Sequence, residues 1–532
     1  MIRKLLGAHR RKSEAYDWVS QSGPQFGLYA RNVFTEYVAI GLNLSLGLLL
    51  LPFNIHYLGQ STYGLWVLAA SVTNYFSILD LGYGSAQVKF AAQYRALRDA
   101  KAINEVASSI FFVFLGIAVA VYGAAWCVAW RLDTIFRLGP HEAAVGRAVL
   151  LIVSVNVALT FPFSVYGGIV NGFQRYYVNH TIAIVTSIAV GIANVLVLLA
   201  GGGVITLVAV TTSIRLCALI AYRHSAHSTF PPLEIRWRHV RRTRLSEVTA
   251  FSLFLLVIDL AAKINMTSDT MVVGAFVGTA AVAVWSVASR LTGTARMLTG
   301  VLTSVLFPTI VHHATRNNID RLQQVMIEGT RVSLATVIPL LVAICALGGP
   351  LVGAWVGPRF AEAVPVIYVL AFAVAIRTGN ISGRAILKGA GQHKFLARWS
   401  IIAAVLNLVL SIVFVRRYGI IGSAMGTVMA GLAVTIGVLF PAACRRVDLR
   451  IVDLFRRAIW PALWPSIAPA ALLVLARSYV EGSIVLILLA GAVGTLVYAA
   501  TFFTLALAPL DRAWYVQRLE TLFRKSGVSL TL

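Results

Sequence analysis

The stretch Leu58–Phe90, LGQSTYGLWVLAASVTNYFSILDLGYGSAQVKF, has a fainter copy later in the chain, VGTAAVAVWSVASRLTGTARMLTGVLTSVLFP, which begins at Val277. The Leu-Gly pair that opens the first stretch matches a Val-Gly pair in the second, and Trp66 matches Trp285 at the same spacing. The two stretches indicate an internal repeat, so the fold depends on what kind of segment is repeated.

The composition is that of a membrane protein. Hydrophobic residues make up 58% of the 532 residues and charged residues 12%, and the mean hydropathy is +0.81. A soluble domain carries about 25% charged residues, so this chain has too little polar surface to cover a globule in water. Apolar runs of about 20 residues span a bilayer as helices, whereas barrel strands are about 10 alternating residues long. The sequence contains about fourteen such runs, which centre on residues 31–53, 62–88, 106–130, 144–170, 178–200, 203–222, 247–275, 279–311, 327–349, 362–386, 397–415, 419–440, 459–479 and 483–508.

Other sequence features argue against further classes of protein. The first 30 residues are polar and basic and the first apolar run is too long for a signal-peptide core, so we expect no cleavable signal. The four cysteines have unrelated spacings, which form neither a disulfide framework nor a metal-binding pattern. Most of the net charge of +25 lies in alternate loops. This is the positive-inside pattern of a membrane protein with both termini in the cytoplasm, and it argues against nucleic acid as a partner. The basic residues 236–244, RWRHVRRTR, are expected to contact anionic lipid headgroups.

The chain is organised as two parallel repeats. The two copies lie on the second and eighth predicted spans, and this even offset of six spans means that both copies run in the same direction. The cytoplasmic segments GFQRYYVN, from Gly172, and GAGQHKFL, from Gly389, repeat at nearly the same spacing. The predicted fold is an all-α integral membrane protein with about 14 transmembrane helices. Its predicted parts are a basic cytoplasmic tail at 1–30, a six-helix bundle at 31–222, a basic cytoplasmic linker at 223–246, a second six-helix bundle at 247–440, two additional helices at 441–508 and a cytoplasmic tail at 509–532.

Two equivalent helices carry polar stripes. Ionisable groups inside a membrane span are costly and usually face a cavity. In the first span, Asn32, Glu36 and Asn43 lie within about 40° of one another around the helix. In the seventh span, the first of the second half, Asp259 and Lys263 share one face. These two residues also have the i, i+4 spacing of a structural ion pair, which is the alternative interpretation.

Cations outnumber acids inside the spans. The cations are Arg215, Lys263, Arg290, Arg296 and Arg377, and the acids are Glu36, Asp80 and Asp259. A cation-rich cavity suits an anionic cargo, because guanidinium groups bind phosphate oxygens in a bidentate manner. We predict a substrate-binding cleft between the halves, with no catalytic residue and no metal site, lined by Glu36, Asn43, Asp259, Lys263, Arg290 and Arg377.

The segment Leu58–Ala96 contains Leu-Gly, Tyr-Gly-Leu-Trp, Leu-Asp-Leu-Gly and Gly-Ser-Ala in this order. It resembles the signature of Wzx-type polysaccharide repeat-unit flippases of the multidrug/oligosaccharidyl-lipid/polysaccharide (MOP) exporter superfamily. The segment Ser268–Leu291 is similar to the start of that family's second half, and GAGQHK is similar to its elbow between the tenth and eleventh helices.

The resemblance implies a MATE-like fold of fourteen helices and alternating access across the bacterial inner membrane. The implied cargo is an oligosaccharide linked to undecaprenyl pyrophosphate, moved from the cytoplasmic to the periplasmic leaflet for exopolysaccharide or O-antigen biosynthesis. We expect the lipid-linked oligosaccharide and membrane lipids as partners, and a polymerase and other polysaccharide-assembly proteins are candidate partners. No cofactor is expected, and coupling to protons or sodium is left open.

Two other members of the superfamily remain alternatives. A multidrug or cation antiporter would favour acidic groups in the cavity, which here are outnumbered. A lipid II-type flippase would share the preference for cations. An enzyme such as a polymerase or ligase would need a large external loop, and every predicted outside loop is short, so we expect no enzyme.

Overall fold

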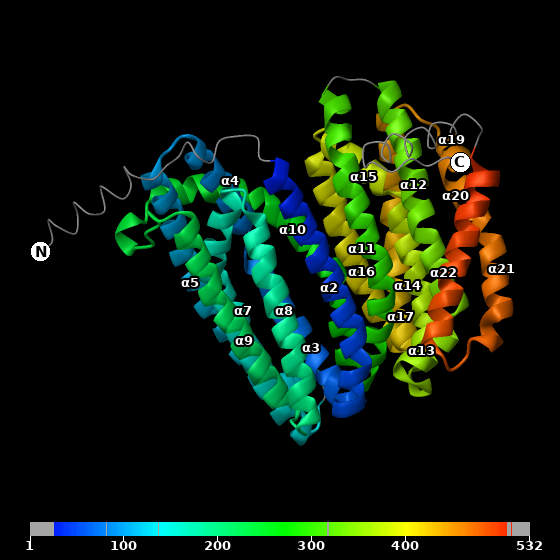
Figure 1. Cartoon of the computed structure of the whole chain (residues 1–532), viewed down its shortest axis with the longest axis horizontal. Helices are drawn as coiled ribbons and strands as arrows, with labels where there is room; N and C mark the ends of the chain where they lie inside the picture. The colour runs from blue at the N-terminus through cyan, green and yellow to red at the C-terminus, as the bar shows by residue number, and fades with distance from the viewer. Residues whose placement is uncertain (1–25, 81, 137, 316–318, 508–511, 513–532) are drawn as a thin grey trace, which may run out of the picture. The chain divides into compact units, whose positions relative to one another are not determined.

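The computed structural model describes residues 26–80, 82–136, 138–315, 319–507 and 512. For residues 26, 27, 29, 30, 77, 78, 85, 250–266, 298–309, 311–315 and 393 it describes the backbone and not the side chains. The regular structure of the described residues is entirely helical (Figure 1). This confirms the predicted all-α class.

The chain divides by its internal packing into two compact units, Met1–Ser286 (unit 1) and Val287–Leu532 (unit 2). The boundary falls within helix α11. Unit 1 contains α2 (Phe26–Leu58), α3 (Gln60–Phe76), α4 (Tyr83–Ala96), α5 (Ala100–Trp130), α6 (Leu132–Phe136), α7 (Pro140–Gly172), α8 (Tyr176–Leu199), α9 (Val204–Thr229), α10 (Arg242–Phe276) and the start of α11 (Thr279–Thr315).

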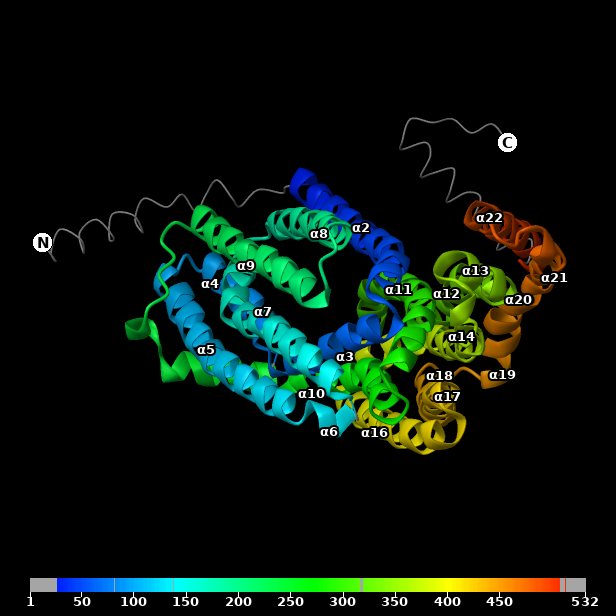
Figure 2. The ribbon, with the colours of Figure 1, turned by 90° about the horizontal axis from the view of Figure 1, so that it is seen from below.

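Unit 1 is built around α7. Helices α5 and α9 pack against α7, and α8 lies beside both α2 and α9 (Figure 2). The core includes Phe114, Phe173 and Phe230, all of which are almost fully buried. Helix α10 packs against α3, α4 and α5. The predicted linker at 223–246 therefore lies within unit 1, while the second six-helix bundle at 247–440 stays a prediction.

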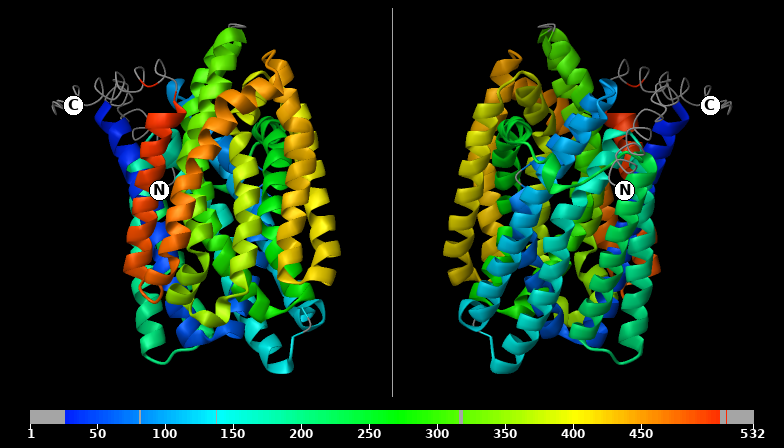
Figure 3. Two further views of the ribbon diagram at one scale, coloured as in Figure 1. Left: turned by 90° about the vertical axis from the view of Figure 1, so that its right-hand side faces the viewer. Right: turned by 90° about the vertical axis from the view of Figure 1, so that its left-hand side faces the viewer.

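Unit 2 contains the rest of α11 and a further series of helices. These are α12 (Ile319–Ala346), α13 (Gly348–Val356), α14 (Ala363–Gly379), α15 (Ile381–Gly389), α16 (His393–Tyr418), α17 (Ile420–Ala430), α18 (Phe440–Arg446), α19 (Ile451–Leu454), α20 (Trp460–Leu463), α21 (Ile467–Ala476) and α22 (Ile484–Thr501). Helices α16 and α17 run alongside each other (yellow in Figure 3). The close approach is possible because Gly426 of α17 has no Cβ, which would lie 2.5 Å from the backbone nitrogen of Ser411.

Ten helices of the described part of the chain are long and apolar enough to cross a membrane, and α14 with α15 forms an eleventh span that is bent by 40°. The remaining three predicted spans coincide with α3, α10 and α11, which are not among these ten. The protein is a multi-pass membrane protein, and the count of fourteen spans stays a prediction.

The repeated sequence motifs adopt matching backbone conformations. Gly59, before α3, and Gly278, before α11, have φ angles of 77° and 119°, which glycine adopts most readily. At the two elbows, the backbone nitrogens of Arg175 and Gln392 donate to carbonyl oxygens five residues earlier, at 3.1 and 3.0 Å. The spacing of the motifs therefore corresponds to the same helix–turn–helix joints in the two copies.

Candidate functional site

The polar stripe on α2 has a structural component. The Asn43 side-chain nitrogen donates to the backbone oxygen of Ala39 at 2.8 Å, and its oxygen accepts from the Ser187 hydroxyl of α8 at 3.1 Å. Asn32 joins α2 to the elbow before α8, because its nitrogen donates to the backbone oxygen of Gln174 at 2.8 Å. Glu36 is exposed. The role of Glu36 in a substrate cleft stays a prediction.

The other predicted cleft residues lie on three helices. Asp259 and Lys263 belong to α10, but their side chains lie outside the described residues. Arg290 of α11 is exposed, and Arg377 is half-buried near the end of α14. Unit 1 holds Glu36, Asn43, Asp259 and Lys263, and unit 2 holds Arg290 and Arg377. Their assembly into one cleft stays a prediction.

Unit 2 surrounds Arg377 with further positive charge. Arg377 interacts electrostatically with Arg384 of α15 and Arg296 of α11. The sequence contains no aspartate or glutamate between Glu362 and Asp448, so α14 to α18 supply no acid to balance these cations. This part of the protein is therefore an electropositive region within predicted membrane spans.

The sequence reasoning missed Arg384, although a signal was present. Arg377 and Arg384 are seven positions apart, which is about two turns of a helix and places them near one face. The structure adds a break between them, at Asn380, where α14 ends and α15 begins. Broken membrane helices often supply ligand-binding groups, because their ends carry partial charges and free backbone groups.

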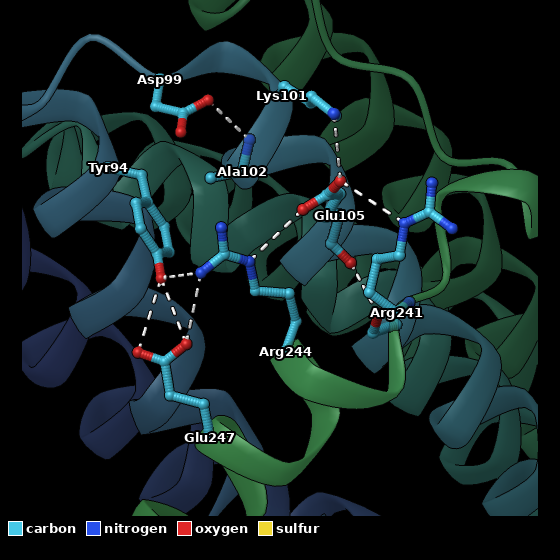
Figure 4. Close-up of polar contacts among 9 residues, drawn as sticks. Tyr94, Asp99, Lys101, Ala102, Glu105, Arg241, Arg244 and Glu247 are labelled. Carbon is cyan, nitrogen blue, oxygen red and sulfur yellow. Dashed lines mark hydrogen bonds and ion pairs between the residues drawn. The ribbon is translucent and has the colours of Figure 1, made fainter.

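A second polar region lies on unit 1, where the start of α10 meets α4 and α5 (Figure 4). Glu105 of α5 forms ion pairs with Arg244 at 3.3 Å, with Arg241 at 3.6 Å and with Lys101 at 4.0 Å. Arg244 also donates to the Tyr94 hydroxyl at 2.7 Å, and that hydroxyl donates to Glu247 at 3.2 Å. We call these residues, other than Lys101, the ionic cluster.

The titration properties of the cluster follow from its packing. Burial, more than the opposing charge of Arg244, raises the pKa of Tyr94 above its ordinary value. Burial would lower the pKa of Arg244, but Tyr94 and the carboxylates of Glu105 and Glu247 outweigh it and raise that pKa. Arg244 therefore remains charged and Tyr94 remains a neutral hydrogen-bond donor at physiological pH.

The predicted linker is also attached to α5 by hydrogen bonds between side chains of α5 and the linker backbone. The Asn104 side chain donates to the backbone oxygen of Pro232 at 2.9 Å and accepts from the backbone nitrogen of Glu234 at 3.0 Å. The Ser109 hydroxyl accepts from the backbone nitrogen of Arg241 at 3.1 Å. These contacts hold the linker against helix α5 of unit 1.

We expect Glu105→Gln to destabilise the protein by about 1.5–3 kcal/mol, the value of a charge-assisted hydrogen bond, because its carboxylate is mostly buried among cations. The matched control is Asp133→Asn, which removes a single exposed ion pair with Arg147 and should cost at most about 1 kcal/mol. Thermal unfolding of the purified protein in detergent measures both. Equal shifts for the two variants would show that the ionic cluster has no special role in stability.

Sequence comparison relates the chain to proteins of polysaccharide assembly. A family model described as "Polysaccharide biosynthesis protein" matches residues 57–365, more than half of the chain. The chain is 24% identical over 162 residues to the probable low-salt glycan biosynthesis flippase Agl15 of Haloferax volcanii, a match that covers 30% of this chain and only 34% of Agl15. It is 23% identical over 379 residues to the succinoglycan biosynthesis transport protein ExoT of Rhizobium meliloti, covering 70% of this chain and 72% of ExoT.

Comparison with solved structures supports the fold. The lipid II flippase MurJ in an inward closed conformation matches with a TM-score of 0.68 at 14% identity, covering 89% of this chain and 98% of MurJ. An inward-facing multidrug resistance MATE family transporter of the MOP superfamily matches with a TM-score of 0.61 at 16% identity, covering 76% and 94%. The predicted MATE-like architecture is thereby confirmed.

Proposed function

The chain belongs to the polysaccharide biosynthesis protein family, and we propose that it is a flippase for a lipid-linked oligosaccharide. The cargo in this proposal is an oligosaccharide on undecaprenyl pyrophosphate, which moves from the cytoplasmic to the periplasmic leaflet of the inner membrane for exopolysaccharide or O-antigen biosynthesis. The descriptions of Agl15 as a probable flippase and of ExoT as a transport protein support this proposal. The protein is a transporter and not an enzyme.

The observation that carries the proposed substrate class is the excess of positive charge in the spans of unit 2. Arg384 and Arg296 both act electrostatically on Arg377, and no acid occurs between Glu362 and Asp448. A pyrophosphate headgroup carries about two negative charges, which cannot cross a low-dielectric core unpaired. Arginines provide compensating charge and bidentate hydrogen bonds to phosphate oxygens. A cationic drug would instead be repelled by this region, which disfavours the multidrug antiporter.

The transport cycle in this proposal is alternating access. The two halves expose a central cleft to one side of the membrane at a time, and the headgroup is carried by the cleft residues Glu36, Asn43, Asp259, Lys263, Arg290 and Arg377. Glu36 and Asp259 are the groups that would carry a coupling proton or sodium ion. Both termini are cytoplasmic in this arrangement, and a polymerase would receive the product in the periplasmic leaflet.

Deletion of the gene is expected to abolish the polymer and to leave its lipid-linked repeat unit in the cytoplasmic leaflet. Polymer production and the amount of lipid-linked intermediate are measured in the deletion strain with and without the complementing gene. Normal polymer production in the deletion strain, in the absence of a second flippase gene, would contradict the proposed function. Increased sensitivity to cationic drugs with normal polymer would instead favour the antiporter.

A further inference from the structure

The break between α14 and α15 contains buried polar atoms that the described residues leave without hydrogen-bond partners. Asn380 and Ser382 are both 0% exposed. The side-chain nitrogen and oxygen of Asn380 and the hydroxyl oxygen of Ser382 have no partner. Buried polar groups in proteins are almost always hydrogen-bonded, so these atoms require a further partner, such as water or a bound ion. Two such residues, separated by one position in the same break, point to a polar binding site.

Helix α12 contributes the facing wall of the same site. Thr330 and Ser333 are also 0% exposed, and their hydroxyl oxygens have no hydrogen-bond partner. Helix α12 packs against both α14 and α15, and Leu334 of α12 lies next to Gly379 at the break. Since Thr330 is one turn before Leu334, it belongs to the same helix face. Thr330 therefore lies on the face of α12 that meets the break, and Ser333 lies in the same turn as Leu334.

The start of α15 adds a partial positive charge. The helix has nine residues and begins at Ile381, so its first backbone N–H groups have no partner within the helix and carry the positive end of the helix dipole. Asn380 precedes this turn and makes no capping hydrogen bond. Its side-chain oxygen lies over Gly383, where a Cβ would approach it to 2.5 Å. Helix starts with free N–H groups favour anions.

The charged residues around the break select the sign of the ligand. Arg377 precedes it by three positions, Arg384 follows it by four, and the two arginines act on each other electrostatically. No acid is present from residue 363 to residue 447. A cation bound at the break would therefore be repelled, whereas an anion would neutralise the arginines and accept hydrogen bonds from Asn380, Ser382 and Thr330.

We propose that the α14–α15 break is a phosphate-type anion site, formed by Asn380, Ser382 and the start of α15, with Thr330 and Ser333 opposite and Arg377 and Arg384 on either side. The inference rests on the proposed function in naming its ligand, which is the pyrophosphate group of the lipid-linked substrate. The site makes the broken span a headgroup-binding element of unit 2.

The test is binding of inorganic pyrophosphate to the purified full-length protein in lipid nanodiscs, followed by calorimetry and by the rise in thermal unfolding temperature. We expect Arg384→Gln to weaken binding by about 10- to 100-fold, the loss of one charge-assisted hydrogen bond, and Arg384→Lys to restore part of it. The control Arg398→Gln removes an exposed arginine of α16 and should bind like the unaltered protein.

A nearly isosteric variant keeps the test valid if loss of an arginine impairs folding. Asn380→Asp places a carboxylate between the two arginines. It should raise the unfolding temperature without ligand, because the carboxylate neutralises the two arginines. It should also weaken pyrophosphate binding by more than about tenfold, because the carboxylate takes the place of the bound anion. Unchanged affinity in both Asn380→Asp and Arg384→Gln would overturn the site.

Two further comparisons separate the alternatives. A prenyl pyrophosphate should bind at least about tenfold more tightly than inorganic phosphate or pyrophosphate, since its chain adds buried apolar area. Equal affinities would assign the site to free anions and overturn the lipid assignment.

Complementation by the unaltered gene is measured in parallel. If it complements but these variants bind normally, the inference fails and the proposed function stands. If it does not complement while binding depends on Asn380 and Arg384, the proposed function fails and the anion site stands.

Discussion

Replacing Gly64 by alanine should leave almost no folded protein. Gly64 of α3 faces the first turn of α11 within unit 1, and a Cβ there would overlap the carbonyl oxygen of Thr279 and lie 2.7 Å from its carbonyl carbon. Overpacking usually costs about 1–3 kcal/mol, but here the obstacle is backbone, which no change of rotamer relieves. The same helix ends are held together by the Ser61 and Thr279 hydroxyls at 2.9 Å and by Gln60 donating to the backbone oxygen of Ala280 at 3.2 Å.

The amount of monodisperse protein after detergent extraction measures this effect. The matched control is Gly123→Ala, since Gly123 is a helical glycine of α5 whose added methyl would meet nothing within 4 Å. That control should be neutral or stabilising by up to about 1 kcal/mol. Extraction of Gly64→Ala at the level of the control would contradict the close packing of α3 on α11.

Loss of either predicted cleft arginine should abolish most polymer production. The proposed cargo needs cations along its path, and a charge-assisted hydrogen bond contributes about 1.5–3 kcal/mol. Arg290→Gln and Arg377→Gln should therefore each weaken binding of the headgroup by about 10- to 100-fold. Lysine at either position should restore part of the activity, because a point charge is kept although the bidentate geometry is lost.

Complementation of the deletion strain, with the membrane level of each variant checked, provides the measurement. Arg359→Gln is the control, because Arg359 is an exposed cation in the turn before α14. Full complementation by both Arg290→Gln and Arg377→Gln at normal expression would show the cationic-cleft mechanism to be wrong, while leaving family membership intact.

The sequence was sufficient for the fold class and for the joints of the repeat. Apolar runs that span a membrane can satisfy their backbone hydrogen bonds only as helices or closed barrels. Runs of about 20 residues have the length of helices and are too long for barrel strands. The Leu-Gly and Val-Gly motifs identify Gly59 and Gly278, which both have positive φ before equivalent helices. These positions can be recognised in a single sequence because a positive φ angle favours glycine over other residues.

Other features depend on tertiary packing, which periodicity does not encode. Asn43 shares a helix face with Glu36, yet it binds Ser187 of α8, a partner that no helical projection of α2 reveals. Glu105 was not singled out, although it anchors the linker through Arg241 and Arg244. The break at Asn380 contains no proline, and its glycines, Gly379 and Gly383, are a weaker signal of a kink that was not singled out. The uncharged residues of the proposed anion site, Asn380, Ser382, Thr330 and Ser333, could be recognised only from their burial.

The most direct measurement of the central claim is the movement of a lipid-linked oligosaccharide between leaflets by the purified protein. The protein is reconstituted into liposomes that contain the undecaprenyl-pyrophosphate-linked repeat unit, and the fraction accessible to an external sugar-binding probe is followed with and without proton and sodium gradients. We expect this fraction to change only in vesicles that contain the protein, and the change to be lost in Arg377→Gln. The same accessibility in protein-containing and empty vesicles under every gradient would contradict the account.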